Sequence, residues 1–465
     1  MQKPCHFYLL PIGGTATAAL AGLLKEAGER VSGVDAVLYP PTSELLADIG
    51  IPVRLGFDPA GIPADLDKVI IGNAIPRSNA EVQAVLARGL PYTSQAEAFG
   101  DRFCRTARTI VVAGTHGKTT TTALTSHILT AGGLDPTALI GGVPCGGRPW
   151  RLGHGGWTVV EGDEYNTAFF DKGPKFLHYH PHLFVVGNVE FDHGDIYSDL
   201  DAILAAFRAG VARVGGSGYV VANSADEGAR AAVADHASVV WYGLAPESTL
   251  SCSTWRVDAG SLHAELHWDG RSFDIEAPLV GRHNLDNLMA ATASALLTGL
   301  TPEAIARAAS TFPGVRRRLE EIGDAAGITV IDDFAHHPTA VGVTLEGTRQ
   351  RYSGRRIVVV FEPRSLTAGR SVFASAYEEA LTKADVVVVA PVFHRARLGH
   401  QALDRNALVA ALCTRGIEAE AVPDDADLLS AVRGHLRVGD VVVCMSSGDF
   451  GGLPRRLVGV LQEEP

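Results

Sequence analysis

Short runs of β-branched and other apolar residues recur along this chain, and they limit its fold more strongly than any other feature. Clear examples are residues 109–113, 356–361 and 385–390. A continuous apolar run is expected of a strand that is covered on both faces. Amphipathic helical stretches follow these runs, which is the β-α-β signature of parallel sheets covered by helices. The sequence therefore predicts an α/β protein built on parallel sheets.

The pattern starts afresh three times, which indicates three domains. A chain of 465 residues is too long for one ordinary core, since a domain has about 100–200 residues. We expect three α/β domains, at residues 1–106, 107–320 and 321–465. The hydrophobic share of 46% and charged share of 20% are typical of a globular protein.

The expected elements follow from these runs and from helix signals. Residues 241–278 alternate polar and apolar residues, as an antiparallel flap does. Strands are predicted at 6–10, 31–34, 68–72, 109–113, 157–160, 183–187, 218–222, 328–331, 356–361, 385–390 and 440–444. Helices are predicted at 17–28, 118–131, 284–297 and 302–310, with Gly28 as a stop and Thr301 as an N-cap.

Charge and cysteine usage exclude several classes of protein. The net charge of −12 argues against a nucleic-acid or anionic-membrane surface, which needs clustered Lys and Arg. The six cysteines are scattered without a C-x-x-C pair, so neither zinc nor disulfides are expected. Residues 7–24 resemble a secretory segment but are broken by Pro11 and by Gly13-Gly14, and no run of about 20 apolar residues could span a membrane. A cytoplasmic location is expected.

The segment Gly114-Thr-His-Gly-Lys-Thr-Thr120 joins a predicted strand to a predicted helix. Backbone N–H groups and a helix N-terminus then meet at one point, which favours a bound phosphate. Lys118 is expected to reach the terminal phosphates, and the Thr119 hydroxyl is the natural magnesium ligand. Val112 stands where the commonest form of this loop has glycine. The remaining predicted cradle residues are Gly114, Thr115, His116, Gly117 and Thr120.

Acidic residues follow the next two strands of this domain. Glu161 comes directly after the strand at 157–160, and ligands of open α/β sheets collect beyond the carboxyl ends of strands. Asp163 and Glu164 follow, and a solvated acidic turn is the alternative interpretation of these acids. After the strand at 183–187 comes Asp192-His193; His193 is a candidate second-metal or substrate ligand, or a loop hydrogen-bonding group.

Two further clusters lie near the predicted domain junctions. Gly281-Arg-His-Asn284 and Asn287 offer amides that read a base or cap a helix. Arg316-Arg317-Arg318 is either functional or a solvated basic patch. Asp332-Asp333-Phe-Ala-His336-His337-Pro338 suggests either metal chelation or a helix start with acids near its positive end.

These motifs, in this order, resemble the Mur ligase family of cell-wall enzymes over essentially the whole chain. The residues that carry the resemblance are Gly-Thr-His-Gly-Lys-Thr-Thr-Thr, Asn-x-x-x-Asp-His, Gly-Arg-His-Asn, Arg-Arg-x-Glu and Asp-Asp-aromatic-x-His-His-Pro. The segments at 161–179, 361–365 and 445–452 are similar to the branch that joins the tripeptide L-alanyl-γ-D-glutamyl-meso-diaminopimelate to UDP-N-acetylmuramate in peptidoglycan recycling. The branch that adds L-alanine alone is the alternative.

The resemblance implies an ATP- and Mg²⁺-dependent ligase that forms an acyl phosphate from a carboxylate. It also implies a Rossmann-like domain that binds the UDP-sugar at 1–106, a P-loop ATPase-type domain with a parallel sheet that binds ATP at 107–320, and a Rossmann-like domain that binds the incoming peptide at 321–465. It implies catalytic roles for Lys118, Glu161, His193 and Arg318, with Thr119, Glu161 and His193 as metal ligands. Asn284 or Asn287 would face adenine, Arg318 the phosphates and Asp333 the ribose. Gly13, Gly14 and Asp35 would belong to the UDP site, and Arg364 would hold a peptide carboxylate. Thr15, Asn73 and His336 are further expected substrate-binding residues.

Asp35 also lies about 20 residues past the glycine turn, where dinucleotide folds place a ribose-binding acid. A hydride-transferring dinucleotide enzyme and a nucleotide-regulated binding protein without catalysis are the competing hypotheses. The partners expected are therefore small molecules only, and the sequence leaves the oligomeric state open, a monomer included.

Overall fold

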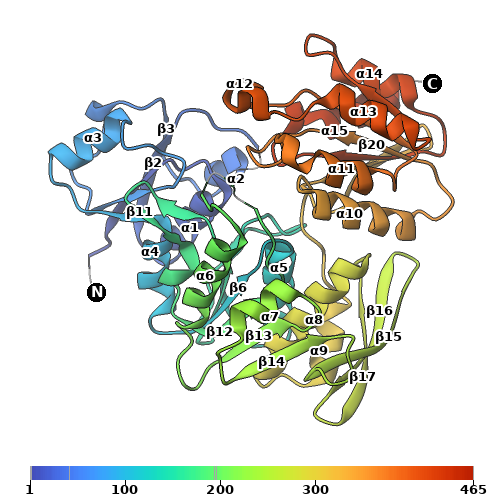
Figure 1. The fold of residues 1–465 in the computed structure, drawn as a ribbon. Coiled ribbons are helices and arrows are strands. Elements are labelled where there is room, and N and C mark those ends of the chain that lie inside the picture. The colour runs from blue at the N-terminus through green and yellow to red at the C-terminus, as the bar shows by residue number, and fades with distance from the viewer. Residues whose placement is uncertain (1–2, 41, 193, 195, 464–465) are drawn as a thin grey trace. The chain divides into compact units, whose positions relative to one another are not determined.

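A computed structural model describes residues 3–40, 42–192, 194 and 196–463. The chain divides into two compact units. One contains the chain up to Thr254 together with Ala264–Glu276 and Asp286–Pro313. The other contains Trp255–His263, Ala277–Leu285 and the chain from Gly314 onward. Three main sheets with their helices are drawn in Figure 1.

The first sheet has five parallel strands in the order β3-β2-β1-β4-β5. Helix α1 ends near Gly28, whose φ of +89° is a conformation that suits glycine. The central strand β1 is largely buried, as a covered parallel strand should be. The strands are β1 (His6–Leu10), β2 (Arg30–Asp35), β3 (Val53–Leu55), β4 (Lys68–Ile71) and β5 (Tyr92–Ser94), and the helices are α1 (Thr15–Glu26), α2 (Thr42–Asp48), α3 (Ala80–Ala87) and α4 (Gln95–Phe99).

The second sheet has ten strands in the order β17-β16-β15-β14-β13-β12-β6-β9-β7-β8. Its parallel part consists of β6 (Arg108–Ala113), β7 (Thr137–Leu139), β9 (Trp157–Gly162), β12 (Pro181–Val186), β13 (Tyr219–Asn223) and β14 (Val239–Gly243). The short β8 (Trp150–Arg151) is antiparallel to β7. Two-residue turns join β15 (Leu250–Asp258), β16 (Ser261–Trp268) and β17 (Arg271–Ala277). The helices are α5 (Lys118–Ala131), α6 (Leu200–Val211), α7 (Glu227–Val233), α8 (Arg282–Leu297) and α9 (Pro302–Ala309).

The third sheet has six strands in the order β18-β19-β23-β20-β21-β22, and only β18 runs antiparallel to its neighbour. Helices α10, α11 and α13 pack on one face and α14 and α15 on the other. The strands are β18 (Glu320–Ala325), β19 (Ile328–Asp333), β20 (Ile357–Phe361), β21 (Val386–Val389), β22 (Glu418–Ala421) and β23 (Val441–Met445). The helices are α10 (Pro338–Arg351), α11 (Ala374–Leu381), α12 (Arg395–Leu398), α13 (Arg405–Thr414), α14 (Leu428–His435) and α15 (Leu453–Glu463).

The predicted α/β class on parallel sheets is confirmed, and each strand predicted at a β-branched run exists with shifts of one or two residues. The expected flap at 241–278 begins too early, because Trp241 belongs to the parallel strand β14. Edge strand β22 was not predicted, since its Glu-Ala-Glu-Ala sequence carries charge. The domain boundaries at 106/107 and 320/321 stay predictions.

The first two sheets share one hydrophobic core. A Cβ on Gly22 of α1 would lie 2.3 Å from the indole of Trp150, so only glycine allows this contact. The rings of Phe99 and Tyr179 meet edge to face at 5.7 Å. The glycine turn before α1 and the phosphate-type loop after β6 are therefore parts of one packed body.

All six cysteines carry free thiols. Within the described part of the chain, no helix is long and apolar enough to cross a membrane.

Candidate functional site

Three adjacent parallel strands bring the predicted phosphate loop and the predicted acids to one edge of the second sheet. Strand β6 lies between β9 and β12, with Ala113 opposite both Gly162 and Val186. The carboxyl ends of parallel strands point the same way, so the segments that follow them meet. Gly114 follows β6 directly, and Asn188 is the second residue after β12. Glu161 is the penultimate residue of β9, whereas the sequence had placed it just after the strand.

The loop has the backbone of a phosphate cradle. Gly114 has a φ of +143° and Gly117 a φ of +82°, values that residues with a side chain rarely adopt. Gly117 is the N-cap of α5, so the helix begins at Lys118. A Cβ on Gly117 would lie 2.3 Å from the amide oxygen of Asn287, and Thr121 donates a 3.0 Å hydrogen bond to that oxygen. Asn287 therefore buttresses the loop from α8.

Lys118 lies within the loop with its ammonium group held on several sides. Its Nζ donates to the carbonyl oxygens of Gly114 and Thr115 at 2.7 and 3.3 Å, and to both oxygens of Glu164 at 2.8 and 3.2 Å. Burial acts to lower the pKa of Lys118, but the neighbouring carboxylates, Glu164 first, outweigh it and raise that pKa. The neighbouring carboxylates thus favour the protonated form of Lys118 at the helix N-terminus.

Thr119 and Glu161 are brought together as candidate metal ligands. The Thr119 hydroxyl donates to Glu161 Oε1 at 3.0 Å, and the backbone N–H of Gly141 donates to Glu161 Oε2 at 2.8 Å. Hydroxyl and carboxylate oxygens are the donors that Mg²⁺ prefers, so this pair fits a magnesium ion. Gly141 was not singled out from the sequence; a Cβ there would lie 2.4 Å from Glu161 Oε2.

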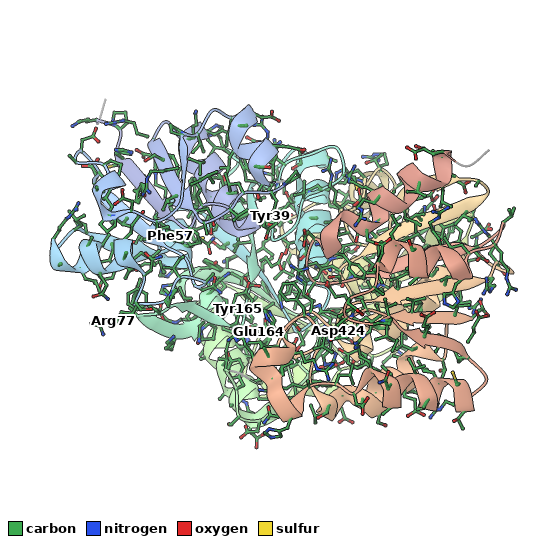
Figure 2. All side chains as sticks on the ribbon, turned by 90° about the horizontal axis from the view of Figure 1, so that it is seen from above. Tyr39, Phe57, Arg77, Glu164, Tyr165 and Asp424 are labelled. Carbon is green, nitrogen blue, oxygen red and sulfur yellow. The ribbon has the colours of Figure 1, made fainter. Side chains whose placement is uncertain are left out.

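The alternative interpretation of the three acids as a solvated turn is wrong. Glu164 is 2% exposed and pairs with Lys118. Asp163 pairs with buried Lys175 at 2.8 Å. Burial acts to raise the pKa of Asp163, but Lys175 and Lys118 outweigh it and lower that pKa. Glu164 and Tyr165 lie next to each other beyond β9 (Figure 2).

The segment after β12 pins the loop. Asn188 accepts from the backbone N–H of His116 at 2.8 Å and donates to its carbonyl at 3.2 Å. The Glu190 backbone N–H donates to the Thr115 hydroxyl at 2.9 Å. The sequence marked this segment for His193, which lies outside the described residues. Asn188 is the first residue of the Asn-x-x-x-Asp-His motif, but the sequence analysis gave it no role of its own.

The segment that follows the acids, residues 166–175, forms a strap between the first two sheets. Strand β10 (Asn166–Ala168) pairs with β11 (Asp171–Pro174). At its tip Phe169 packs against the core of the first sheet, and Phe170 meets Tyr92 of β5 edge to face at 5.0 Å. At its root lies Lys175, paired with Asp163. Both ends of this segment therefore lie near the phosphate loop, and its tip lies on the first sheet.

The predicted UDP-site residues lie at the carboxyl ends of β1, β2 and β4. The Gly13 backbone N–H donates to Asp35 Oδ2 at 2.7 Å, and a Cβ on Gly13 would lie within 2.7 Å of Asp35 and Leu38. Gly14 is the N-cap of α1, which begins at Thr15. Asn73 is exposed just past β4. The structure joins Gly13 and Asp35 as the sequence spacing predicted, and their ligand remains a prediction.

Asn284, Arg318 and Asp333 belong to the second compact unit. Asn284 donates to the Val280 carbonyl at 2.8 Å. Asp333 accepts from the backbone N–H groups of Leu319 and Ala335, both at 2.7 Å. Burial raises the pKa of Asp333, although the nearby charge of Arg318 opposes this. Asp333 thus braces the segment that carries Arg318.

Residues 316–318 were open to interpretation as a solvated basic patch. Two of the three arginines also pack on an aromatic ring, because the guanidinium groups of Arg317 and Arg318 lie 5.2 and 4.7 Å from the centre of the Phe334 ring. A helix does start within the segment 332–338, as one of the two interpretations expected, but the two acids do not lie in its first turn. Asp332 and Asp333 end β19, and α10 begins only at Pro338 with no acid in its first turn.

His336, a predicted substrate-binding residue, and Arg364, the predicted peptide residue, follow β19 and β20 of the third sheet. His336 Nδ1 lies 3.1 Å from the Phe334 carbonyl oxygen. Arg364 lies 3.2 Å from an oxygen of Asp449 and 4.0 Å from the centre of the Phe393 ring. The guanidinium of Arg364 is thereby oriented at the carboxyl end of the sheet, and its peptide-binding role stays a prediction.

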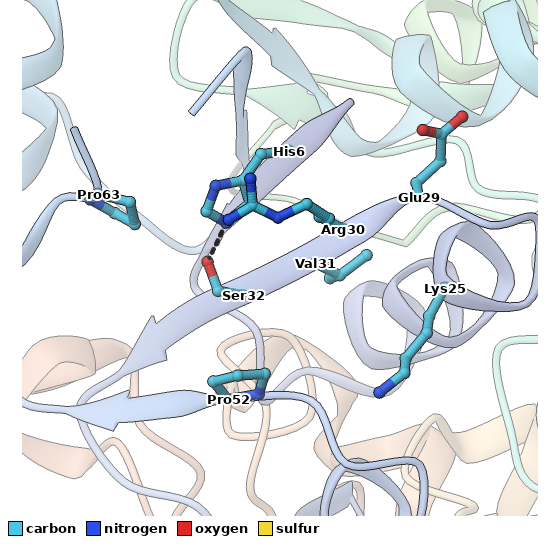
Figure 3. Close-up of a pocket in the computed structure, with 8 residues that line it drawn as sticks. All are labelled: His6, Lys25, Glu29, Arg30, Val31, Ser32, Pro52 and Pro63. Carbon is cyan, nitrogen blue, oxygen red and sulfur yellow. Dashed lines mark hydrogen bonds between the residues drawn. The ribbon is translucent and has the colours of Figure 1, made fainter. Parts of the chain in front are cut away.

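A separate pocket of about 450 Å³ lies at the opposite, amino ends of β1 and β2 (Figure 3). Its charged groups have internal partners: Lys25 donates to the Gly50 carbonyl, Arg30 pairs with Asp65, and His6 bonds to Ser32. This pocket contains none of the predicted site residues.

Comparisons with known proteins agree with this geometry. Three family models match: "Mur ligase family, catalytic domain" at residues 6–105, "Mur ligase middle domain" at 161–295, and "Mur ligase, glutamate ligase domain" at 317–448. The chain is 36% identical over 469 residues, covering 99% of both chains, to the UDP-N-acetylmuramate–L-alanyl-γ-D-glutamyl-meso-2,6-diaminoheptandioate ligase of Escherichia coli (strain K12).

A second type of relative has similar identity. The UDP-N-acetylmuramate–L-alanine ligase of Roseiflexus sp. (strain RS-1) is 34% identical, covering 99% of this chain and 100% of the relative. Among solved structures, a murein peptide ligase from Psychrobacter arcticus 273-4 matches with a TM-score of 0.76 and 30% identity, covering 99% of both chains.

Proposed function

The chain belongs to the Mur ligase family, and we propose that it uses MgATP to join the tripeptide L-alanyl-γ-D-glutamyl-meso-diaminopimelate to UDP-N-acetylmuramate. One observation carries the ATP-dependent part. Lys118 at the start of α5 stands beside Thr119, whose hydroxyl lies 3.0 Å from Glu161. The full-length similarity to a relative named for this substrate pair supports the choice of substrates.

Addition of L-alanine alone is the second candidate, because relatives with that name are up to 34% identical over nearly the whole chain. The segment at 161–179, which contains the acids and the strap, resembles the tripeptide branch and therefore favours the first candidate.

The chemistry requires an activated carboxylate, because oxide is a very poor leaving group. In the proposed reaction a carboxylate oxygen of UDP-N-acetylmuramate attacks the γ-phosphorus of ATP, and ADP leaves. The tripeptide amine then attacks the acyl phosphate, loses a proton and expels phosphate, which forms the amide. Mg²⁺ would neutralise the charge on the transferring phosphoryl group.

The residues of this chain would hold the reactants in place. Lys118 and the N–H groups at the start of α5 would bind the nucleotide phosphates, and Thr119 with Glu161 would hold magnesium. Asn287, Asn284, Arg318 and Asp333 are proposed for the rest of the nucleotide. The UDP-sugar is assigned to Gly13, Gly14, Thr15, Asp35 and Asn73, and the peptide to His336 and Arg364.

Release of ADP tests the proposal. We expect release only when UDP-N-acetylmuramate and the tripeptide are both present, and L-alanine should not replace the tripeptide. Release with L-alanine alone would establish the second candidate. Oxidation of NADH would instead support a hydride-transfer enzyme, and binding of both substrates without a ligated product would support a binding protein.

The Lys118→Ala variant tests the role of the loop. It should abolish ligation while UDP-N-acetylmuramate still binds, since Gly13 and Asp35 lie on another sheet. Turnover retained at more than about 1% would contradict the mechanism, because removal of one charge-stabilising group commonly costs about 10²–10³-fold in rate. Small-molecule partners and a cytoplasmic location belong to the same proposal, which the free thiols support.

A further inference from the structure

Lys175 is a buried cation that the proposed reaction does not yet use. It is 6% exposed and opens a short 3-10 turn, Lys175–His178, directly after β11. Its Nζ lies 2.8 Å from Asp163 Oδ2, 3.2 Å from the Tyr165 hydroxyl and 4.5 Å from the centre of the Tyr165 ring. Its backbone N–H donates to the Asp163 carbonyl at 3.0 Å. A lysine is almost never this buried unless its charge is paired.

The pairing distributes charge around the phosphate loop. Three carboxylates, those of Glu161, Asp163 and Glu164, lie within four residues at the carboxyl end of β9. Glu164 pairs with Lys118 and Asp163 with Lys175. Asp163 is the neighbour of Glu164 in the chain, and the Glu164 carboxylate lies 2.8 Å from Lys118 Nζ, so the charge of Lys118 also acts on Asp163. If Lys175 lost its charge, Lys118 would have to compensate the carboxylates of both Asp163 and Glu164.

We propose that Lys175 is a positioning residue for the nucleotide: by neutralising Asp163, it leaves the charge of Lys118 to the nucleotide phosphates. The inference rests on the proposed use of MgATP. The inference also assigns a role to the strap. Its tip packs Phe169 on the first sheet, and the chain then returns and places Lys175 beside Asp163.

The charge of Lys175 is tested best together with the charge of Asp163. Lys175→Met removes the ammonium group and keeps an unbranched side chain of similar length. Lys175→Arg keeps the positive charge. The double variant Lys175→Met/Asp163→Asn removes both members of the pair, so no uncompensated carboxylate remains beside Lys118. Lys172→Met is the matched control, since Lys172 is exposed on the same strap.

The measurements are calorimetric binding of MgADP to the full chain, and kcat with KM for ATP. Lys175→Met should weaken MgADP binding and raise the KM for ATP by about tenfold each, with kcat changed less than about twofold. Lys175→Arg, the double variant and Lys172→Met should stay within about twofold of the wild type. Thermal unfolding checks that each variant is folded, and Lys175→Gln replaces Lys175→Met if the latter is not.

Two results overturn the inference: MgADP binding by the folded single variant that equals the wild type, or a double variant as impaired as the single one. The second result would mean that Lys175 only anchors the strap. A wild-type chain that binds no MgADP would instead refute the proposed function, so the two failures are distinguishable.

Discussion

Lys118 Nζ lies 2.8 Å from Glu164 Oε2, and the two side chains are only 11% and 2% exposed. The lysine of the phosphate loop is thus paired with an acid that lies three residues beyond Glu161 along the chain. The pair keeps the ammonium group at the start of α5, because a buried carboxylate cannot lose its partner without a large cost. Glu164 therefore orients Lys118, while Glu161 faces Thr119.

Glu164→Gln should reduce both stability and the use of ATP. Removing one charge of a buried pair costs about 3–5 kcal/mol, so we expect the free energy of unfolding to fall by about 3 kcal/mol. Misplacement of Lys118 should lower kcat/KM for ATP by about 10²-fold. Urea unfolding and steady-state kinetics measure the two effects. Glu247→Gln is the control, since Glu247 is exposed in the same domain; equal behaviour of the two variants would contradict an orienting role.

Gly141→Ala should raise the Mg²⁺ concentration needed for half-maximal activity. The new Cβ would lie 2.4 Å from Glu161 Oε2, so the carboxylate must move from the place where it faces Thr119. A shift of this kind lowers the rate by about 10²-fold when it displaces a catalytic group. A Mg²⁺ titration at saturating ATP measures the Mg²⁺ concentration that gives half-maximal activity. At Gly147 the nearest atom to a new Cβ is 3.6 Å away, so Gly147→Ala should show wild-type Mg²⁺ dependence.

Asn188→Ala should loosen the phosphate loop, because the His116 N–H and carbonyl both lose their side-chain partner. An unsatisfied buried polar group costs about 1–3 kcal/mol, which corresponds to MgADP binding weakened by about tenfold or more. Calorimetry measures the affinity. Asn223→Ala removes an asparagine at the end of β13 whose amide oxygen accepts from Ala225. Weakening of the same size in that control would show that the effect is not specific to the loop.

His435 should make the stability of the third sheet depend on pH. Burial acts to lower its pKa, but Glu420 and Glu418, at 2.8 and 3.0 Å, outweigh it and raise that pKa above the usual value. A raised pKa in the folded state means that the stabilisation is complete below the unfolded pKa of about 6.5. It is then lost as the pH rises through the folded pKa.

His435→Gln should therefore lower the free energy of unfolding by about 0.5–1 kcal/mol at pH 6, as expected of a partly exposed ion pair. The loss should be smaller at pH 9. Denaturant unfolding at both pH values measures it. A destabilisation that is the same at both values would exclude the ionic origin.

The sequence by itself determined the class of fold and most of the phosphate loop. Uninterrupted runs such as Ile357–Phe361 predicted buried parallel strands, because a strand that is covered on both faces consists of apolar residues throughout. Gly117 and Lys118 predicted a helix N-terminus for an anion, because that chemistry is local and needs only neighbouring residues. The acids after β9 were found for the same reason, since parallel strands end at one edge.

Only the tertiary structure decided which partner each of these acids has. Nothing local separates Glu161, Asp163 and Glu164, which the sequence left open to interpretation as a solvated turn. Their partners come from two other places: Thr119 and Lys118 from α5, and Lys175 from the root of the strap. Gly141 was not predicted, and Asn188 was noted only as part of a motif, because their contacts join residues 20 and 72 positions apart in the sequence. Hydrophobic patterning is periodic along the chain, whereas a charge acquires its partner only when the strands are assembled.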